Sequence, residues 1–392
     1  MKTKLLTGSL FAAVLLGLIY FMAQEPQTSG SQTPANTAQI EAQHADSAQA
    51  SSAPDVNLIA GDNPDFQFTG RINYAMPGTP EISWPGTMIR ARFTGPSLAI
   101  DLEDQYGMNY FNVFIDEDWE NPIIIEAKLG RKTYPIADSL TEGEHSFTLT
   151  KRTEGEQGVT KFHGVILAEG ESLLAPPARP ERRIEFYGDS ITSGMGNEAP
   201  EDGPDDHLGQ KNSFMTYAAM TARNLDAEFV SISQSGIGLM VGFVSFTMQE
   251  YFDQLTGLGD NDSQWDFSQW IPDVVVINLF QNDSTLIEQR LDPIPDDEQR
   301  IQVYLDFVKT IRSKYPDAYI VCTLGTMDAV KPGSPWPDYI HAAVDRLKAE
   351  TGDERVAVKI LPFGDFYKHP RVSHHRENAE ILTAFIKEEM GW

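Results

Sequence analysis

Two residues with the chemistry of acyl transfer, Ser190 and His369, stand far apart in this 392-residue sequence. Ser190 follows residues 183–188, Arg-Ile-Glu-Phe-Tyr-Gly, whose alternating pattern predicts a strand that ends in a tight turn. Such a turn presents a hydroxyl at the carboxyl end of a sheet, where open α/β folds bind ligands. Pro370 disfavours helical geometry at His369 and keeps the imidazole in a loop. We therefore predict a serine nucleophile with a histidine base.

The residues around Ser190 carry a family resemblance. Residues 188–196, Gly-Asp-Ser-Ile-Thr-Ser-Gly-Met-Gly, resemble block I of the GDSL or SGNH hydrolases, and with the following Asn-Glu they resemble carbohydrate esterase family 2, the acetylxylan esterase type. The last block of that family is a His-Pro before the closing helix, which His369 and Pro370 match. The resemblance implies that Ser190 is the nucleophile and His369 the base. His374 and His375, which follow shortly after, are the alternatives for the base.

Two further motifs would complete an oxyanion hole, which needs fixed donors beside the reacting carbonyl. Ser190 offers its own backbone N–H. Residues 233–238, Ser-Gln-Ser-Gly-Ile-Gly, resemble block II of the family, whose glycine donates an N–H. We predict that this donor is Gly236, with Gly238 as the second choice; the alternative is a turn glycine without a catalytic role.

Residues 278–283, Asn-Leu-Phe-Gln-Asn-Asp, resemble block III, and the resemblance implies that Asn282 donates its side-chain amide to the oxyanion. The alternative is an asparagine that only shapes a turn. The glycine of the family is replaced by Phe280, whose ring either narrows the acyl site or packs inward. Asp283 is predicted to be a loop or capping carboxylate.

The group that orients the base departs from the family pattern. The family usually carries an aspartate two residues before the histidine, and related enzymes carry one three before; Tyr367 and Phe366 occupy these positions. Three interpretations remain open. Asp365 reaches the imidazole through an altered loop, a backbone carbonyl holds it in a Ser–His dyad, or the base is weakened and the protein is a poor enzyme. The dyad is chemically acceptable because one fixed acceptor suffices to set the tautomer.

Other candidate site residues are fewer. Trp336 follows the fourth predicted strand at the same edge of the sheet and is predicted to stack on a sugar ring, with packing inside its loop as the alternative. The acidic loops 201–206 and 259–262 lack the EF-hand pattern and are predicted to be solvated. We predict no metal and no cofactor, because neither a His/Cys cluster nor a glycine-rich phosphate cradle stands out.

Strands and helices alternate over residues 182–392, the predicted catalytic domain. The expected strands are 183–188, 228–232, 273–279, 318–324 and 355–361, and the expected helices are 214–225, 298–314, 339–350 and 377–389. This alternation predicts the fold class α/β, with a doubly wound sheet of about five parallel strands. The lone Cys322 is expected to be a buried small hydrophobe.

Residues 57–173 show a different pattern of short alternating segments between turn signals, which predicts a β-sandwich. Residues 84–93 and 109–116 resemble the N-terminal jelly-roll domain of the same esterase family. A proline-rich connector, Leu-Ala-Pro-Pro-Ala-Arg-Pro-Glu at 174–181, separates this part from the catalytic domain.

The first 56 residues predict export. Two lysines precede an apolar run that ends near residue 23, which indicates either an uncleaved membrane anchor or a cleaved signal peptide. Residues 24–56 are rich in Gln, Ala, Ser, Thr and Pro and are predicted to form a disordered linker. The formal net charge of −27 argues against nucleic acid as a partner. The inner membrane is a predicted partner through the N-terminal segment.

These features predict an exported serine esterase that removes O-acetyl groups from a xylan-like polysaccharide through an acetyl-enzyme intermediate. Two alternatives belong to other classes. One is a broader SGNH acylhydrolase acting on lipid, aryl or cell-wall esters. The other is a non-catalytic carbohydrate-binding envelope protein, suggested by the missing aspartate and by Phe280.

Overall fold

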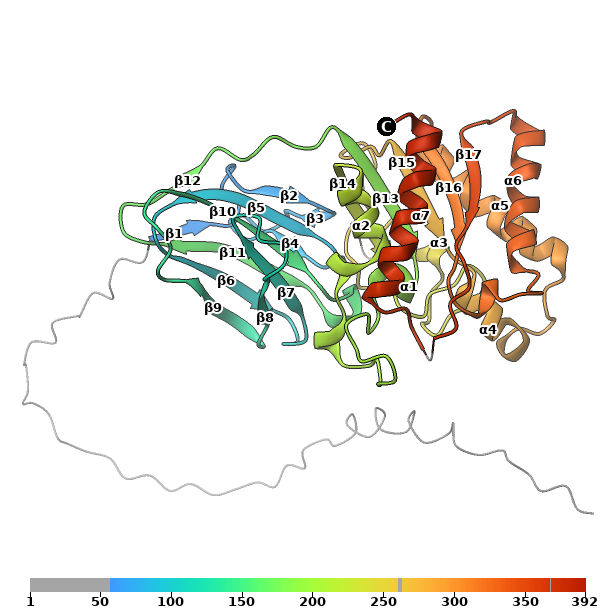
Figure 1. Cartoon of the computed structure of the whole chain (residues 1–392), viewed down its shortest axis with the longest axis horizontal. Coiled ribbons are helices and arrows are strands. Elements are labelled where there is room, and N and C mark those ends of the chain that lie inside the picture. Colours follow the sequence, from blue (N-terminus) through green and yellow to red (C-terminus); the bar gives the residue numbers. More distant parts are fainter. Residues whose placement is uncertain (1–56, 260–262, 367) are drawn as a thin grey trace, which may run out of the picture. The chain divides into compact units, whose positions relative to one another are not determined.

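Short alternating strands build the first part of the chain. The computed structural model describes residues 57–259, 263–366 and 368–392. In β5 (Met88–Thr94) the side chains of Ile89, Ala91 and Phe93 are buried while their neighbours are half-buried, because alternate side chains of a strand point to opposite faces. Two antiparallel sheets of this kind enclose one apolar core (Figure 1). The predicted β-sandwich is confirmed.

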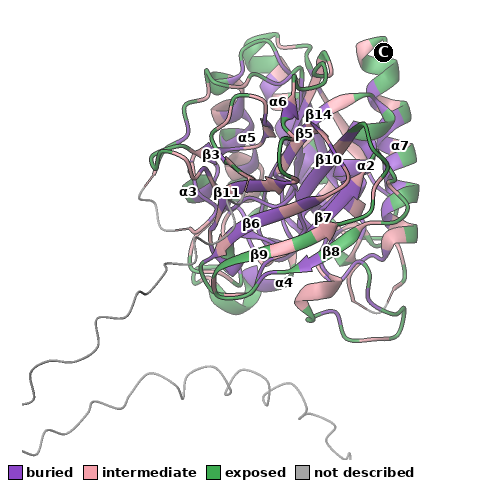
Figure 2. Ribbon diagram, turned by 90° about the vertical axis from the view of Figure 1, so that its left-hand side faces the viewer, coloured by how far each residue is buried: buried purple, intermediate pink, exposed green. Residues whose placement is uncertain are grey.

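One sheet has the order β3-β4-β11-β6-β9 with β1 paired to β11, and the other has the order β12-β5-β10-β7-β8 with β2 paired to β5. The central strands are mostly buried, whereas the edge strands β8 and β9 carry most of the exposed side chains (Figure 2). Besides β5, the strands are β1 (Asn57–Ala60), β2 (Gln67–Thr69), β3 (Ile72–Asn73), β4 (Glu81–Ile82), β6 (Leu98–Asp104), β7 (Tyr110–Ile115), β8 (Ile123–Glu126), β9 (Gly130–Ala137), β10 (Glu144–Lys151), β11 (Thr160–Leu167) and β12 (Leu173–Leu174). A 3₁₀ turn, η1 (Gly155–Gln157), lies between β10 and β11.

A five-stranded parallel sheet forms the second part, in the order β14-β13-β15-β16-β17. Its strands are β13 (Arg182–Gly188), β14 (Ala227–Ser233), β15 (Val274–Asn278), β16 (Tyr319–Leu324) and β17 (Val356–Ile360). The register places Gly188, the last residue of β13, beside both Ser233 and Asn278. The three segments that follow these strands therefore leave the sheet at one edge, where ligands of doubly wound folds bind.

Helices cover both faces of this sheet (Figure 1). On β13, Ile184 and Phe186 share a core with α2 (Tyr217–Asn224) and α7 (Val372–Met390), whereas Tyr187 belongs to the core under α5 (Asp297–Lys314) and α6 (Trp336–Thr351). The remaining helices and 3₁₀ turns are α1 (Ser190–Ser193), α3 (Met248–Tyr251), α4 (Gln281–Arg290), η2 (Leu208–Gln210), η3 (Ser213–Met215) and η4 (Asp328–Val330). The predicted doubly wound α/β fold is confirmed, and Cys322 is buried in β16.

The predicted helices differ from the observed ones mainly at their starts. α6 begins at Trp336 rather than at residue 339, because proline is tolerated in a first helical turn. α7 begins at Val372 rather than at residue 377. α4 was not predicted: only Leu286 and Ile287 are buried apolar residues in its ten positions, so its sequence lacks an apolar stripe of helical period.

The sandwich and the parallel sheet share buried polar contacts. Arg71 is 1% exposed, and its Nη1 donates to the carbonyls of Phe252 at 2.7 Å and Gln254 at 2.8 Å. The indole N–H of Trp84 donates to Leu255 O at 2.8 Å. These side chains come from the sandwich and bind the segment after α3, so the two parts are joined by groups that water does not reach.

The predicted anchor or signal at 1–23 and the predicted linker at 24–56 lie outside the described residues. Within the described part of the chain, every helix is too short or too polar to cross a membrane. The described residues also contain no group of three or more His, Cys, Asp or Glu side chains placed to hold a metal ion together.

Candidate active site

The strand β13 delivers Ser190 to the carboxyl edge of the parallel sheet. Gly188 ends the strand, and a Cβ atom there would lie 2.0 Å from the hydroxyl oxygen of Thr192, so only glycine fits this turn. Asp189 caps the short helix α1 by accepting a hydrogen bond from Ile191 N–H at 2.9 Å. Ser190 is therefore held at the first helical position, where it is 5% exposed.

The imidazole of His369 lies directly beside this serine. Its Nε2 atom is 3.0 Å from Ser190 Oγ, within hydrogen-bond distance. His369 lies in the loop before α7, and Arg371 fixes that loop by donating to Gly196 O at 3.0 Å and to His369 O at 3.2 Å. The structure thus brings together the two residues that the sequence offered as nucleophile and base.

The second imidazole nitrogen identifies a residue that sequence reasoning missed. Asp205 Oδ2 lies 2.7 Å from His369 Nδ1, and the Asp205 side chain is 7% exposed. Asp365 is exposed and forms no hydrogen bond to a described residue, so the interpretation that Asp365 orients the base is wrong. The acceptor on Nδ1 is also not a backbone carbonyl, which removes the dyad interpretation. A side-chain carboxylate is present, and it comes from a different loop.

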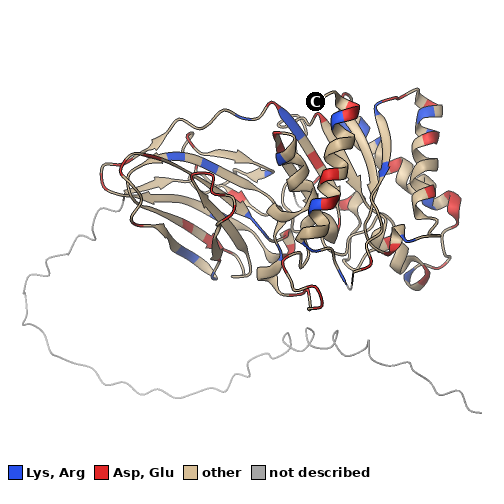
Figure 3. Ribbon diagram, in the orientation of Figure 1, with Lys and Arg blue, Asp and Glu red and all other residues tan. Residues whose placement is uncertain are grey.

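Asp205 belongs to the acidic loop 201–206 that the sequence assigned to solvent, and Figure 3 shows the run of acidic residues there. Its approach depends on Gly196, which has φ +55° and whose Cβ, if present, would lie 2.2 Å from Asp205 Cβ. Burial by itself would raise the pKa of the Asp205 carboxyl. The hydrogen bond from His369 and the charges of His369 and Lys368 outweigh burial and lower that pKa to about 2.

The other two histidines of this region lie elsewhere. His374 Nδ1 accepts a hydrogen bond from Arg371 N–H at 3.0 Å, at the start of α7. His375 is fully buried between α7 and α2, where its Nδ1 accepts from Tyr217 N–H at 3.1 Å. Neither contacts Ser190, so the alternatives to His369 as the base are wrong.

Backbone donors are available beside the serine. Gly236 follows β14 with φ +82°, and a Cβ there would meet the Cβ of Phe243 at 2.9 Å. Among the described residues, neither Gly236 N–H nor Ser190 N–H has a hydrogen-bond partner. Gly238 is instead packed against Val241 O, which a Cβ would approach to 2.1 Å. Unpaired N–H groups at adjacent strand ends are suited to bind an oxyanion.

Asn282 connects the segments after β14 and β15. Its side-chain nitrogen donates to Ile237 O at 2.7 Å, one residue beyond Gly236, and an amide nitrogen has a second hydrogen to offer. The neighbouring Asp283 is fully buried and accepts hydrogen bonds from the N–H groups of residues 239, 240 and 241 at 3.0, 2.6 and 3.1 Å. Burial raises the pKa of this carboxyl even though these donors oppose the shift. Asp283 therefore caps the N–H groups of this loop, as predicted for a capping carboxylate, but it does so from the first turn of α4 and not from a loop.

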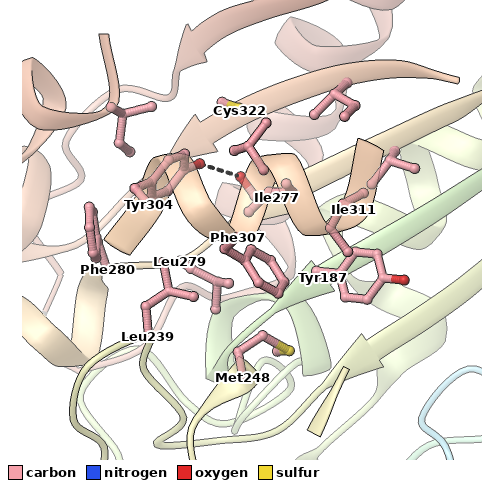
Figure 4. Close-up of a cluster of buried hydrophobic side chains, with 14 of the residues drawn as sticks. Tyr187, Leu239, Met248, Ile277, Leu279, Phe280, Tyr304, Phe307, Ile311 and Cys322 are labelled. Carbon is pink, nitrogen blue, oxygen red and sulfur yellow. Dashed lines mark hydrogen bonds between the residues drawn. The ribbon is translucent and has the colours of Figure 1, made fainter. Parts of the chain in front are cut away.

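The ring of Phe280 packs inward, away from the solvent. Phe280 has φ +95° and is 0% exposed, and Figure 4 shows its ring beside Tyr304. Its ring centroid lies 5.0 Å from that of Tyr304 and 5.0 Å from that of Trp336. Trp336 itself is 6% exposed and also packs on Tyr339 at 5.4 Å. The prediction that Trp336 stacks on a sugar is wrong, because its ring is used to cover Phe280.

Two family models match this chain. Residues 68–177 match carbohydrate esterase 2 N-terminal, and residues 186–380 match the GDSL-like lipase/acylhydrolase family. The chain is 33% identical to the cellulase/esterase CelE of Acetivibrio thermocellus over 84% of its own length, but it spans only 40% of CelE. It is 25% identical to an acetylxylan esterase / glucomannan deacetylase of Cellvibrio japonicus, covering 86% of this chain and 92% of that protein.

A solved structure of a family two carbohydrate esterase from Clostridium thermocellum, in complex with cellohexaose, is similar along almost its entire length. The two chains superpose with a TM-score of 0.76 at 32% identity, which covers 83% of this chain and 99% of the other. The similarity therefore includes both the sandwich and the parallel sheet that carries Ser190.

Proposed function

The chain belongs to carbohydrate esterase family 2, a family of carboxylic ester hydrolases, and from this we propose that it is an exported serine esterase that removes O-acetyl groups from a xylan-like polysaccharide. The observation that carries the proposal is the row of hydrogen-bonding groups Ser190–His369–Asp205 beside unpaired backbone N–H groups. A serine, an imidazole and a carboxylate in this order form the arrangement that activates a hydroxyl for acyl transfer.

The first half of the reaction forms an acetyl-enzyme. Ser190 Oγ attacks the acetyl carbonyl carbon while its proton passes to His369 Nε2, and the carbonyl oxygen becomes an oxyanion. When the tetrahedral intermediate collapses, the bond to the sugar oxygen breaks and His369 returns its proton to that oxygen. The sugar leaves with a free hydroxyl, and the acetyl group stays on Ser190.

Water completes the cycle by the same route. His369 takes a proton from a water molecule, which attacks the acetyl carbonyl, and the proton then passes to Ser190 Oγ as acetate leaves. Asp205 keeps a proton on Nδ1, so that Nε2 holds the lone pair in both steps. Its negative charge also stabilises the imidazolium that forms twice per turnover.

The oxyanion is bound by the N–H groups of Ser190 and Gly236 and by the side-chain amide of Asn282. Such donors act without reorganisation because the surrounding fold already fixes them. The hydrogen bond to Ile237 O fixes the side chain of Asn282. The three hydrogen bonds that Asp283 accepts fix the loop of residues 239–241. Each donor is worth roughly 10²- to 10³-fold in kcat in enzymes of this type.

The choice of substrate is supported by the relatives. One is named acetylxylan esterase / glucomannan deacetylase, and a similar esterase structure holds cellohexaose. Export is supported only by the apolar run near the start of the sequence. Cell fractionation tests export: recovery in the membrane pellet, periplasm or medium is expected, and recovery in the cytoplasm alone would contradict it.

Acetate release from a panel of acetylated glycans tests the activity, with Ser190→Ala measured beside the wild type. We expect release by the wild type from acetylated xylan or glucomannan and a loss of several orders of magnitude in the variant. Equal, near-zero release by both proteins, with glycan binding retained, would instead favour a non-catalytic binding protein. A series of nitrophenyl esters separates the remaining alternative, since preference for octanoate over acetate would indicate a broader acylhydrolase.

A further inference from the structure

One carboxylate from the sandwich, that of Glu154, accepts hydrogen bonds from the segments that flank the proposed oxyanion hole. Glu154 follows β10 and is 0% exposed. Its Oε1 accepts hydrogen bonds from Ser193 Oγ at 2.9 Å and Ser235 Oγ at 2.6 Å, and its Oε2 accepts from Gln234 Nε2 and Ser235 N–H, both at 2.8 Å. All these donors belong to the part of the chain that carries the parallel sheet.

These donors come from the two segments that the proposed mechanism uses most. Ser193 ends α1, the short helix that begins with Ser190. Ser235 directly precedes Gly236, so the two hydrogen bonds from Ser235 fix both its side chain and the backbone just before the Gly236 N–H. One carboxylate therefore sets the distance between the nucleophile helix and the loop that supplies an oxyanion donor.

The charge of Glu154 is balanced locally. Lys211, 3% exposed, lies 3.2 Å from Glu154 Oε1, on the segment that follows Asp205. Burial would raise the pKa of the Glu154 carboxyl, but the charge of Lys211 and the hydrogen bonds from Ser235 and Ser193 hold that pKa below its ordinary value. Glu154 is thus a buried anion that binds five donor groups of four residues, and its removal would take away the acceptor of the Ser235 N–H and of Ser235 Oγ.

The sandwich holds Glu154 from its own side. The buried Lys151 donates from Nζ to Glu154 O at 2.7 Å and to Thr153 O at 2.8 Å, and Glu154 N–H donates to Gln157 Oε1 at 3.0 Å. The adjacent Gly155 approaches the other part of the chain so closely that a Cβ would lie 1.7 Å from Gly257 O. The backbone of this loop is therefore fixed on both sides.

We propose that Glu154 is a positioning residue for the esterase reaction, which holds the Ser235–Gly236 peptide and α1 in register so that the oxyanion donors meet the carbonyl attacked by Ser190. This inference rests on the proposed function. It makes the sandwich part of the catalytic apparatus, because the residue that aligns the site is supplied by it. Misplacement of a reacting group by about 1 Å can cost roughly 10²-fold in rate.

The test is Glu154→Gln in the full chain, with Glu169→Gln, at an exposed glutamate after β11, as the matched control. Gln keeps the size of the side chain but replaces one acceptor oxygen by a donor that faces Gln234 and Ser235. With 4-nitrophenyl acetate we expect kcat to fall about 10²-fold and KM to change less than threefold. Affinity for a boronic acid that mimics the tetrahedral intermediate should fall in parallel. The control should match the wild type, because Glu169 is exposed and is not among the donors and charges around Glu154.

A folded Glu154→Gln variant with kcat within twofold of the wild type would overturn the proposal, as would a loss confined to KM. If that variant does not fold, Ser235→Ala decides: we expect kcat to fall about 3- to 10-fold with unchanged KM, and no change in kcat would contradict the proposal.

Failure of the proposed function is recognised separately. In that case the wild type releases no acetate from any ester. Labelling of Ser190 by a fluorophosphonate still reports the oxyanion donors, and an equal labelling rate in wild type and Glu154→Gln would then reject the role of Glu154.

Discussion

Asp205 Oδ2 lies 2.7 Å from His369 Nδ1, although the two residues are 164 positions apart. The carboxylate that orients His369 therefore comes from the loop after α1, and not from the residues just before the histidine. The loop 201–206 and the loop before α7 are joined a second time by Arg371, which donates to Gly203 O at 3.3 Å. The position of the carboxylate depends on these contacts more than on its place in the sequence.

Replacing this carboxylate should weaken the base without removing it. We expect Asp205→Asn to lower kcat by about 10²- to 10⁴-fold, because the amide neither stabilises the imidazolium nor keeps the proton on Nδ1. KM for 4-nitrophenyl acetate should change little. The matched control is Asp365→Asn, a neighbour of the histidine in sequence that is exposed and is expected to retain kcat within twofold. A near-normal rate for Asp205→Asn would remove Asp205 from the mechanism.

The oxyanion role of Asn282 is tested by its removal. We expect Asn282→Ala to lower kcat by about 10²- to 10³-fold with a small change in KM, because the amide acts mainly on the transition state. Gln289→Ala, at the exposed end of the same helix α4, serves as the control and should match the wild type. If Asn282→Ala raised KM and left kcat unchanged, the amide would bind ground-state substrate and not the oxyanion.

The packing and the backbone conformation of Phe280 predict how its replacement changes the free energy of unfolding. A phenylalanine at φ +95° is strained by about 1–3 kcal/mol, whereas loss of a buried phenylalanine side chain costs about 3–5 kcal/mol. The packing loss is larger, so we expect Phe280→Gly to lower the free energy of unfolding by roughly 2 kcal/mol, measured in urea.

Phe280→Ala separates the two effects, because alanine loses the same ring and keeps a Cβ at positive φ. It should be less stable than Phe280→Gly by about 2 kcal/mol, which is the strain that only glycine relieves. Equal stability of the two variants would show that the backbone at this position is not strained.

The layers of the fold were predictable because their signals are local. Residues 273–279 are a nearly continuous apolar run, as expected of a strand covered on both faces, and they contain β15. The ends of the predicted strands also place Ser190, Gly236 and Asn282 at one edge of the sheet, and this inference needs no knowledge of side-chain contacts. The carboxylate that orients His369 could not be predicted in this way. The loop 201–206 contains several carboxylates, and nothing in the local sequence distinguishes Asp205 from the others. Asp205 is distinguished only by the packing of this loop against Gly196.

The prediction that Trp336 stacks on a sugar was wrong for a related reason. The sequence places it after β16 at the active-site edge, but it does not state which side of the loop the indole occupies. The deciding fact is the fully buried ring of Phe280, which packs against the Trp336 ring at a centroid distance of 5.0 Å. The position of Trp336 is thus explained by the ring that it packs against, and not by its place after β16.

The buried His375 predicts how stability depends on pH. Burial, and then the charges of His374 and His369, lower its pKa to about 3 from the ordinary 6.5. The stability that this neutral imidazole contributes is complete above pH 6.5 and is lost as the pH falls toward 3, at about 1.4 kcal/mol per pH unit. The Asp189 carboxyl, whose pKa is raised by burial to about 7, acts in the opposite direction. Urea unfolding of wild type and His375→Gln at about pH 7 and pH 4.5 therefore isolates the histidine: the stability gap between the two proteins should narrow by about 2 kcal/mol at the lower pH, and a constant gap would show that His375 is protonated alike in both states.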